Sequence, residues 1–303
     1  MQQQTRNSNR SPSPIRRNIS RSSESNADYD PTYGIRSGHN FETRQKFTRF
    51  LEESYKRFQS SGGPQYVMAR GINKKALDWL DSRRRTLPPM RVSHDEIEEK
   101  LIIKLVSRQH EALHRIFMHF VCKELENMGV KMLDDFWLEG AGREEGRQSR
   151  KKEPDDSFKP LHTRPKFEDS PTFVIEAGLN GTLNKLRNDA FYWLTQPSQR
   201  VRIVVLIHGF TERKVITIEV WQFLDNPRPR RARSAARSRR PTKTQTLTIR
   251  KRDNSPPIVT GAPLLLPVDA LFEIVPPSVT ENAVSLSAQI LEMYAGPIFN
   301  SMQ

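Results

Sequence analysis

The most reactive side chains in this sequence include two histidines that lie four positions apart. His110 and His114 flank the run Glu111-Ala112-Leu113, which gives the pattern H-E-x-x-H. On a helix this spacing places both imidazoles on one face, where they could bind one metal ion. A third ligand is needed, and His119 lies about 140° further round the helix. A helix that exposes histidine and glutamate also produces this pattern by chance, so a solvated helix face is the alternative interpretation.

Acidic residues near the end of a strand form a second reactive group. The stretch from Pro171 to Trp221 reads as strand, turn, helix, strand, turn and strand. Its first strand, Thr172 to Glu176, is apolar and β-branched and ends in a carboxylate. Gly178 lies in the following turn, and a helix with one apolar face leads to a buried strand at Arg202 to Ile207. These patterns predict an α/β core with Glu176 at the end of a strand.

The remaining elements are predicted from helical and strand patterns on both sides of this core. The strongest helical pattern runs from Ser93 to Met128, where Ser93 and Glu96 form a capping box and Gly129 provides the stop. The other expected elements are helices over Asn40–Ser60, Lys74–Arg84 and Glu281–Tyr294, a strand within Val130–Leu138, and a hairpin of Val215–Phe223 with Thr246–Lys251.

The order of these elements resembles the core of the restriction-endonuclease-like superfamily over about Ser93 to Trp221. That superfamily carries the signature PD, a variable gap and then (D/E)-x-K, and Pro154-Asp155 and Glu176 match its acidic positions. The run PDDSF, PTFVIEAG, LRNDAFYWL, VRIVVLI and ITIEVW is also similar to a group of uncharacterised fungal proteins thought to carry this nuclease-like core. The resemblance implies an α/β fold with a mixed sheet flanked by helices.

The same resemblance implies a metal-dependent phosphodiesterase site. In such a site two carboxylates, here Asp155 and Glu176, hold Mg²⁺, and a lysine orients the attacking water. Gly178 stands where the signature has its lysine. Some relatives place this lysine on the following helix, which makes Lys185 the candidate catalytic lysine. An ordinary surface ion pair between Lys185 and Asp189 is the alternative, and an incomplete triad is typical of an inactive member.

Composition divides the chain into three parts. Residues 1–38 are rich in Ser, Arg, Asn and Gln and are expected to be a disordered tail. Residues 39–92 are expected to form a helical extension, and residues 93–303 the nuclease-like domain. Within that domain, residues 226–244 interrupt a hairpin and are expected to be a disordered basic insert.

The positive charge of the chain points to anionic partners. A net charge of +14 favours nucleic acid first and an acidic membrane surface second. Part of this charge comes from an arginine run that predicts contact with nuclear import machinery or with phosphates: Arg228, Arg230, Arg231, Arg233, Arg237, Arg239 and Arg240. No apolar run of ~18 residues and no secretory signal are visible, and there is one cysteine. We therefore expect an intracellular protein without a membrane anchor, located in the nucleus.

Three hypotheses about function follow from the sequence. The first is a nucleic-acid-associated domain of nuclease ancestry, either a weak Mg²⁺-dependent nuclease or an inactive descendant. The second is a non-enzymatic nuclear scaffold with the same fold, and the third is a zinc peptidase that uses His110 and His114. An α/β-hydrolase, which the strand before His208-Gly209 would suggest, is excluded because no G-x-S-x-G elbow follows.

Overall fold

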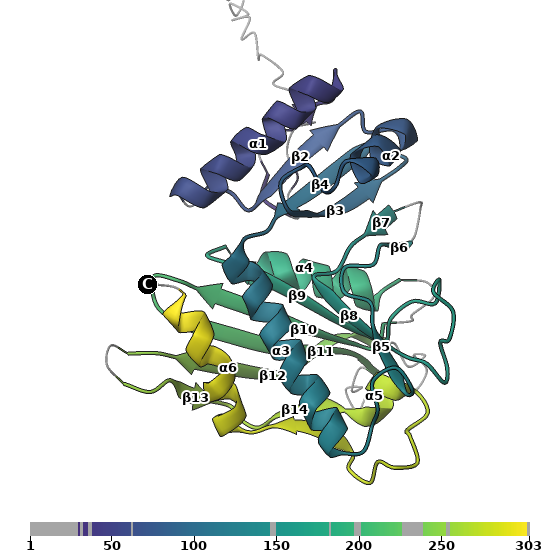
Figure 1. Ribbon diagram of the computed structural model, residues 1–303, viewed down its shortest axis with the longest axis vertical. Helices are drawn as coiled ribbons and strands as arrows, with labels where there is room; N and C mark the ends of the chain where they lie inside the picture. Colours follow the sequence, from purple (N-terminus) through teal and green to yellow (C-terminus); the bar gives the residue numbers. More distant parts are fainter. Residues whose placement is uncertain are drawn as a thin grey trace, which may run out of the picture.

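The computed structural model of this protein describes residues 30, 33–35, 38–61, 63–145, 150–181, 183–196, 201–225, 239–252 and 255–301. Two lobes lie one above the other along the long axis of the molecule, each with its own sheet and apolar core (Figure 1). The fold class is α/β, with a mixed sheet flanked by helices in the larger lobe, as the sequence predicted.

The smaller lobe is a sheet with two helices on one face. Its elements are β1 (His39–Asn40), α1 (Arg44–Ser61), β2 (Tyr66–Arg70), α2 (Lys74–Ser82), β3 (Met90–Asp95), β4 (Lys100–Leu105), β6 (Glu144–Glu145) and β7 (Arg150–Lys152). Among the described residues, the strand order is β1-β2-β4-β3-β7-β6. Leu101 and Ile103 of β4 share a buried core with Phe47 of α1. Because alternate residues of a strand share a face, Ile102 and Lys104 point to the opposite side of this sheet.

The larger lobe is built on a second sheet that is wider than the first. Its elements are α3 (Arg108–Asn127), β5 (Phe136–Leu138), β8 (Asp156–Pro160), β9 (Phe173–Leu179), α4 (Leu183–Leu194), β10 (Ile203–Phe210), β11 (Val215–Asp225), β12 (Arg239–Arg250), β13 (Ile258–Thr260), β14 (Leu264–Pro267), α5 (Val268–Phe272), β15 (Ala283–Leu286) and α6 (Ala288–Asn300). In the described part of the chain, the strand order is β13-β12-β11-β10-β9-β8-β5. β9 and β10 are parallel, and β8 is antiparallel to β9.

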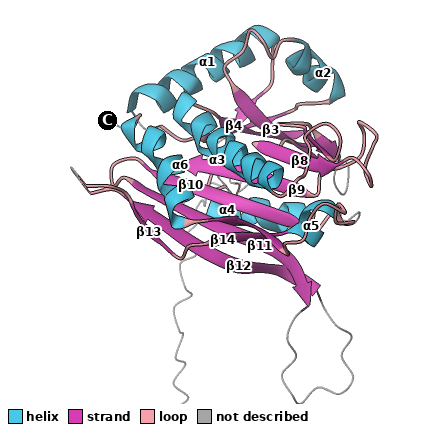
Figure 2. Ribbon diagram, turned by 60° about the horizontal axis from the view of Figure 1, so that its bottom comes forward, coloured by secondary structure: helices cyan, strands magenta, loops and turns pink. Residues whose placement is uncertain are grey.

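Helices cover both faces of this larger sheet. Helices α3 and α6 lie on one face and α4 on the other, which Figures 1 and 2 show from two directions. Ile175 of β9 belongs to the core beneath α3 and α6, whereas its neighbour Val174 packs with Trp193 of α4. Glu176 lies on the same strand face as Val174, so its side chain points toward α4.

Several predictions of local structure are confirmed. The predicted order of helix, strand, strand, strand, helix and strand is present as α3, β5, β8, β9, α4 and β10, although β9 does not end at Glu176 but continues through Gly178 to Leu179. The predicted hairpin is present as β11 and β12, which pair from Val215 with Arg250 to Asp225 with Arg239. The closing helix is also present, although it begins at Ala288 rather than at Glu281.

The predicted helix from Ser93 to Met128 is wrong over residues 93–107. β3 and β4 occupy this part, joined by a turn in which Glu99 has a φ of 45°. The helix begins at Arg108, and the Ser107 hydroxyl caps it by accepting a hydrogen bond from the His110 N–H. The apolar stripe that suggested a helix fits a strand equally well, because β4 is buried on both of its faces.

The predicted division of the chain also needs correction. Residues 39–92 are not only helical, because β2 and β3 form part of a sheet there. The tail predicted to be disordered up to residue 38 includes Tyr33 and Ile35, which are buried against β2 and β4. The insert predicted over 226–244 ends earlier, because strand pairing starts at Arg239. Residues 1–29 and 226–238 lie outside the described residues.

Candidate active site

Asp155 and Glu176 lie close together because β8 and β9 are antiparallel neighbours. Asp155 directly precedes β8, and its backbone N–H donates to the Ile175 carbonyl at 3.2 Å. The Nζ of Lys104 lies 2.5 Å from Asp155 Oδ2 and 3.0 Å from Glu176 Oε2. The exposed fractions of Asp155, Glu176 and Lys104 are 1%, 1% and 5%. The structure therefore brings together the two acids that the sequence paired, and it places an ammonium group between them.

A second lysine extends this arrangement into a chain of alternating charges. The Nζ of Lys152, the last residue of β7, lies 3.2 Å from Glu176 Oε1 and 2.5 Å from Asp189 Oδ1. The Tyr33 hydroxyl donates to the same Asp189 oxygen at 2.8 Å. Both lysines belong to the sheet of the smaller lobe, whereas all three carboxylates belong to the larger lobe. We call Lys104, Lys152, Asp155, Glu176 and Asp189 the lysine network, and it joins the two lobes.

Further hydrogen bonds complete the lysine network on the side of the larger lobe. Trp193 Nε1–H donates to Glu176 Oε1 at 2.7 Å, and the Ala177 N–H donates to Asp155 Oδ2 at 2.7 Å. His110 Nε2 lies 3.3 Å from the same Asp155 oxygen. Within the described residues, Asp155 Oδ1 is buried without a hydrogen-bond partner. The other three oxygens of Asp155 and Glu176 each already have a hydrogen-bond or ion-pair partner.

Burial and the neighbouring charges shift the pKa values of this network. Burial raises the pKa of Asp155, but Lys104 and His110 outweigh it and hold that pKa well below its usual value. Burial also raises the pKa of Glu176, and there the two lysines only partly oppose it. Burial lowers the pKa of Lys104, yet Asp155 and Glu176 overcome it, so the net shift is upward. Lys104 therefore stays a cation, and the arrangement is that of paired charges in a dry interior.

The predicted Mg²⁺ site does not fit this arrangement. Mg²⁺ binds oxygens at about 2.1 Å in an octahedron, so two ligand oxygens lie no more than about 4.2 Å apart. Here the Lys104 ammonium separates the oxygens of Asp155 and Glu176. Among the described residues, the three metal-ligand side chains whose donor atoms converge within 4.8 Å are His110, Glu111 and His114 instead. A metal ion could lie between Asp155 and Glu176 only after Lys104 had left.

The prediction of Lys185 as the catalytic lysine is also wrong. Its Nζ lies 5.4 Å from the centroid of the Tyr66 ring, on the wall of a pocket. The alternative surface ion pair with Asp189 is wrong as well, because Asp189 is fully buried and pairs with Lys152. Lys104 and Lys152 occupy the place expected for the catalytic lysine. A charged residue inside the apolar run KLIIKL was the signal for Lys104, but the helix assignment concealed it.

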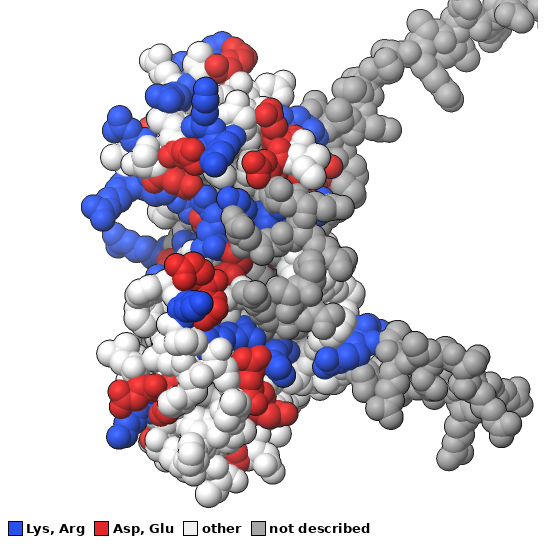
Figure 3. Space-filling view, turned by 90° about the vertical axis from the view of Figure 1, so that its right-hand side faces the viewer, with Lys and Arg blue, Asp and Glu red and all other residues white. Residues whose placement is uncertain are grey.

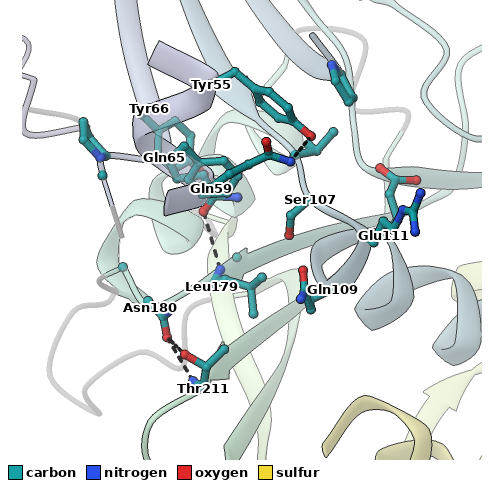
Figure 4. A pocket seen from close by; sticks show the side chains of 18 of the residues that line it. Tyr55, Gln59, Gln65, Tyr66, Ser107, Gln109, Glu111, Leu179, Asn180 and Thr211 are labelled. Carbon is teal, nitrogen blue, oxygen red and sulfur yellow. Dashed lines mark hydrogen bonds between the residues drawn. The ribbon is translucent and has the colours of Figure 1, made fainter. Parts of the chain in front are cut away.

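A pocket of about 1040 Å³ lies beside the lysine network, between the lobes (Figure 4). The rings of Tyr55, Phe58 and Tyr66 line it on the side of the smaller lobe, and the cationic side chains of Arg108 and Lys185 line it on the other. The ends of β9 and β10 form its floor. There the Asn180 side chain accepts a hydrogen bond from the Thr211 N–H at 2.9 Å. Neither Asp155 nor Glu176 lines this pocket.

Of the comparisons with known proteins, only the comparison with solved structures gives a match. No family model and no curated protein matches the chain, so the resemblance to fungal proteins stays a prediction. Four solved chains match. One is a protein from Anabaena variabilis ATCC 29413 described as "a putative nuclease belonging to DUF820". It is 14% identical, with a TM-score of 0.37, and the match covers 67% of this chain and 90% of that one. A similarity this low shows nothing about the function of this chain.

Proposed function

We propose that this chain is a nucleic-acid-binding protein that has a nuclease-like fold and does not cut its ligand. One observation carries the proposal: Lys104 Nζ lies between Asp155 Oδ2 and Glu176 Oε2, at 2.5 Å and 3.0 Å. A phosphodiesterase of the expected kind needs both carboxylates free to bind metal and facing the substrate. Here the protein itself supplies the cation, and both carboxylates are buried.

The pocket supports binding of a single-stranded nucleic acid. Aromatic rings offer stacking surfaces for bases, and lysine or arginine beside them pairs with phosphates. Tyr55 and Phe58 supply the rings in this pocket, while Arg108 and Lys185 supply the cations. The net charge of +14 adds a long-range attraction for a polyanion. Figure 3 shows many Lys and Arg side chains over the smaller lobe and the junction, and fewer over the lower part of the larger lobe.

Fluorescence polarisation with labelled single-stranded DNA and RNA tests the binding. We expect Lys185→Glu and Arg108→Glu to weaken binding at least about 10-fold, because each replaces an attraction for phosphate by a repulsion. Lys123→Glu is the matched control, since Lys123 is exposed on the same helix as Arg108 but does not line the pocket. Equal losses in all three variants would show a general effect of charge and would contradict binding in the pocket.

A cleavage assay tests the second half of the proposal. The purified chain is incubated with single- and double-stranded DNA and RNA in Mg²⁺ or Mn²⁺, and the products are separated by electrophoresis. We expect no metal-dependent cleavage. Cleavage that is retained through purification and lost in both Glu176→Gln and Asp155→Asn would overturn the proposal. Cleavage that persists in both variants would indicate a contaminating nuclease.

A Mg²⁺-dependent phosphodiesterase is the second candidate, and one feature of the site favours it. Asp155, Glu176 and two lysines lie together, which is the full set of side chains that the resemblance implies. Asp155 Oδ1 also has no hydrogen-bond partner within the described residues, although Arg91 Nε lies 3.9 Å from it. This activity would require the smaller lobe to move away and take Lys104 with it. The same cleavage assay separates the two candidates.

Nuclear location remains a proposal that rests on the arginine run. Of its seven members only Arg239 and Arg240 are described, both in β12. The two have exposed side chains, and Arg239 lies over the ring of Phe223. Deleting residues 228–238 from a fluorescently tagged chain should move the protein out of the nucleus. No change in distribution would contradict an import role.

Among the described helices, none combines the length and the apolar character that crossing a bilayer requires.

A further inference from the structure

A second group of buried side chains lies next to the lysine network on the first turns of α3. His110 and His114 are both fully buried, and Glu111 lies between them in sequence. Glu111 Oε1 is 3.9 Å from His110 Nδ1, and Glu111 Oε2 is 3.5 Å from His114 Nε2. These two imidazole nitrogens have no hydrogen-bond partner within the described residues. We call His110, Glu111 and His114 the histidine cluster.

The hydrogen bond of His110 determines which of its nitrogens carries the proton. His110 Nε2 lies 3.1 Å from the Ala177 carbonyl oxygen, which can only accept a hydrogen bond. Nε2 must therefore carry a hydrogen. In the neutral ring, Nδ1 then has a bare lone pair. That lone pair belongs to one of the two unpartnered atoms of the histidine cluster.

In His114 the opposite ring nitrogen makes the hydrogen bond. His114 Nδ1 lies 3.2 Å from Asp156 Oδ2, so Nδ1–H donates to a carboxylate. Burial lowers the pKa of His114, but Asp156 and Glu111 outweigh it and hold that pKa above its usual value, so an ion that binds Nε2 must displace the proton there. A metal-bound histidine almost always donates its other ring N–H to a carboxylate or a backbone carbonyl, and this partner fixes both the tautomer and the ring orientation. His114 has the carboxylate partner, and His110 has the carbonyl partner.

We propose that the Nδ1 of His110, the Nε2 of His114 and the carboxylate of Glu111 together bind one Zn²⁺ ion. Their donor atoms lie within 4.8 Å of one another, and two nitrogens with one carboxylate oxygen are a ligand set that zinc accepts. Three protein ligands leave a fourth position of the tetrahedron open. Glu111 also lines the pocket (Figure 4), so an ion can reach the cluster from that side. This site is separate from Asp155 and Glu176 and does not depend on the proposed binding of nucleic acid.

Two arginines compete with the ion for Glu111. Arg91 donates to Glu111 Oε1 at 2.8 Å, and Arg115 donates to Oε2 at 2.9 Å. The side chain of Arg115 is 62% exposed, so its ion pair contributes little and is easily replaced. Arg91 is more buried and can keep Oε1 while Oε2, the oxygen nearer to His114, binds the ion. We therefore expect a site of moderate affinity.

Metal titration of the full-length protein tests the proposal. Protein stripped with a chelator is titrated with ZnCl₂ by calorimetry and with CoCl₂ by visible absorption, which reports tetrahedral coordination. We expect one ion per chain. His114→Gln and Glu111→Gln should each weaken zinc binding by at least about 10- to 100-fold. Removing only the hydrogen-bond partner of a metal ligand already causes a loss of this size. His119→Ala is the matched control, because His119 is exposed on the same helix.

Each outcome decides for or against the site. Saturable 1:1 binding that is lost in Glu111→Gln and kept in His119→Ala supports it. No binding at about 100 µM metal, or equal loss in His119→Ala, overturns it, since any surface histidine would then account for the result. Because His114 is buried, circular dichroism is used to check that His114→Gln folds. If it does not fold, the result for Glu111→Gln decides, since Glu111 is partly exposed. Histidine side-chain NMR of the metal-free protein should show Nε2–H on His110 and Nδ1–H on His114. The reverse tautomers would also contradict the proposal.

Discussion

The lysine network and the histidine cluster lie next to each other between the lobes, yet they differ in how their ligand atoms are used. In the lysine network four of the six carboxylate oxygens have an ammonium, an indole N–H, a hydroxyl or a backbone N–H as hydrogen-bond partner, whereas Asp155 Oδ1 and Asp189 Oδ2 have none within the described residues. In the histidine cluster two buried nitrogens have none among the described residues. Carboxylates that are arranged like a metal site can therefore already be paired with cations of the protein itself. A better test for a metal site is whether the donor atoms that converge on it still have free lone pairs.

The comparison predicts that Lys104→Met has the largest effect on stability. The substitution leaves Asp155 and Glu176 buried without the ammonium that they share. Removing one partner of a buried ion pair costs about 3–5 kcal/mol, because the remaining charge is uncompensated. Urea denaturation measures the change in the free energy of unfolding. Lys100→Met is the control on the same strand, since the Lys100 side chain is 20% exposed and its ion pairs should contribute less than about 1 kcal/mol.

Two outcomes of the Lys104→Met experiment would change the interpretation. A loss no larger than that of Lys100→Met would mean that the lysine network does not hold the lobes together. A folded Lys104→Met protein that gains Mg²⁺-dependent cleavage would mean that Lys104 blocks a functional site. The double variant Lys104→Met/Glu176→Gln should recover part of the lost stability, because it removes one of the two charges left unpaired.

Asp156→Asn should affect the histidine cluster and leave the lysine network intact. Asp156 accepts from His114 Nδ1 and, within the described residues, makes no hydrogen bond or ion pair with Lys104 or Lys152. Losing the carboxylate partner of a metal-binding histidine typically weakens metal affinity by about 10- to 100-fold. Calorimetric titration with ZnCl₂ measures this, with exposed Asp134→Asn as the control. Unchanged zinc affinity in Asp156→Asn would show that His114 does not depend on Asp156 for its orientation.

The sequence predicts the larger lobe better than the smaller one, and the reason is physical. Strand β9 and helix α4 each follow a local pattern, so the meeting of Asp155 with Glu176 could be expected from two neighbouring strands. Lys104 could not be placed in this way, because it reaches these acids from a different sheet. Its burial depends on how the two lobes pack, and periodicity along one segment contains no information about that contact.

The segment that was wrongly predicted as helix also shows that a local pattern does not determine structure. Ile97, Leu101 and Leu105 fall on one helical stripe, yet Ile97 is 72% exposed and the other two are buried in a strand. A strand that is buried on both faces loses the alternation that would identify it. Only the second half of the pattern, from Arg108 onward, is helical. The histidine cluster lies on that half, which is why its spacing could be recognised from the sequence.

Acid titration separates the histidine cluster from an ordinary helix surface. Burial raises the pKa of Glu111, but His114 and Arg91 outweigh it and hold that pKa at about 2, below its ordinary value of 4.5. Since the folded-state pKa is depressed, the stabilisation by Glu111 is complete above about pH 4.5 and is lost as the pH falls toward 2. In metal-free protein we expect Glu111→Gln to lower stability by about 1–2 kcal/mol at pH 7, after allowing for partial exposure. That difference should disappear near pH 2.

Denaturation of both proteins across this pH range measures the effect. Exposed Glu126→Gln, on the same helix, is the control and should change stability little at any pH. A constant difference between Glu111→Gln and the unmodified chain from pH 7 to pH 2 would contradict the link to ionisation. It would mean that Glu111 acts through packing rather than through its charge.

The smallest expected effect concerns Tyr33, which extends the lysine network into the N-terminal segment. Its hydroxyl donates to Asp189 Oδ1, and Lys152 contacts the same oxygen, so Tyr33→Phe leaves Asp189 with one cation. We expect a loss of about 1 kcal/mol, the usual value of one hydrogen bond. Tyr192→Phe is the matched control, because the Tyr192 hydroxyl is buried without a hydrogen-bond partner in the described part of the chain. Removing an unpaired hydroxyl should be neutral or slightly stabilising. Opposite signs for the two substitutions would show that only the first hydroxyl belongs to the lysine network, whereas equal losses would mean that both rings contribute through packing alone.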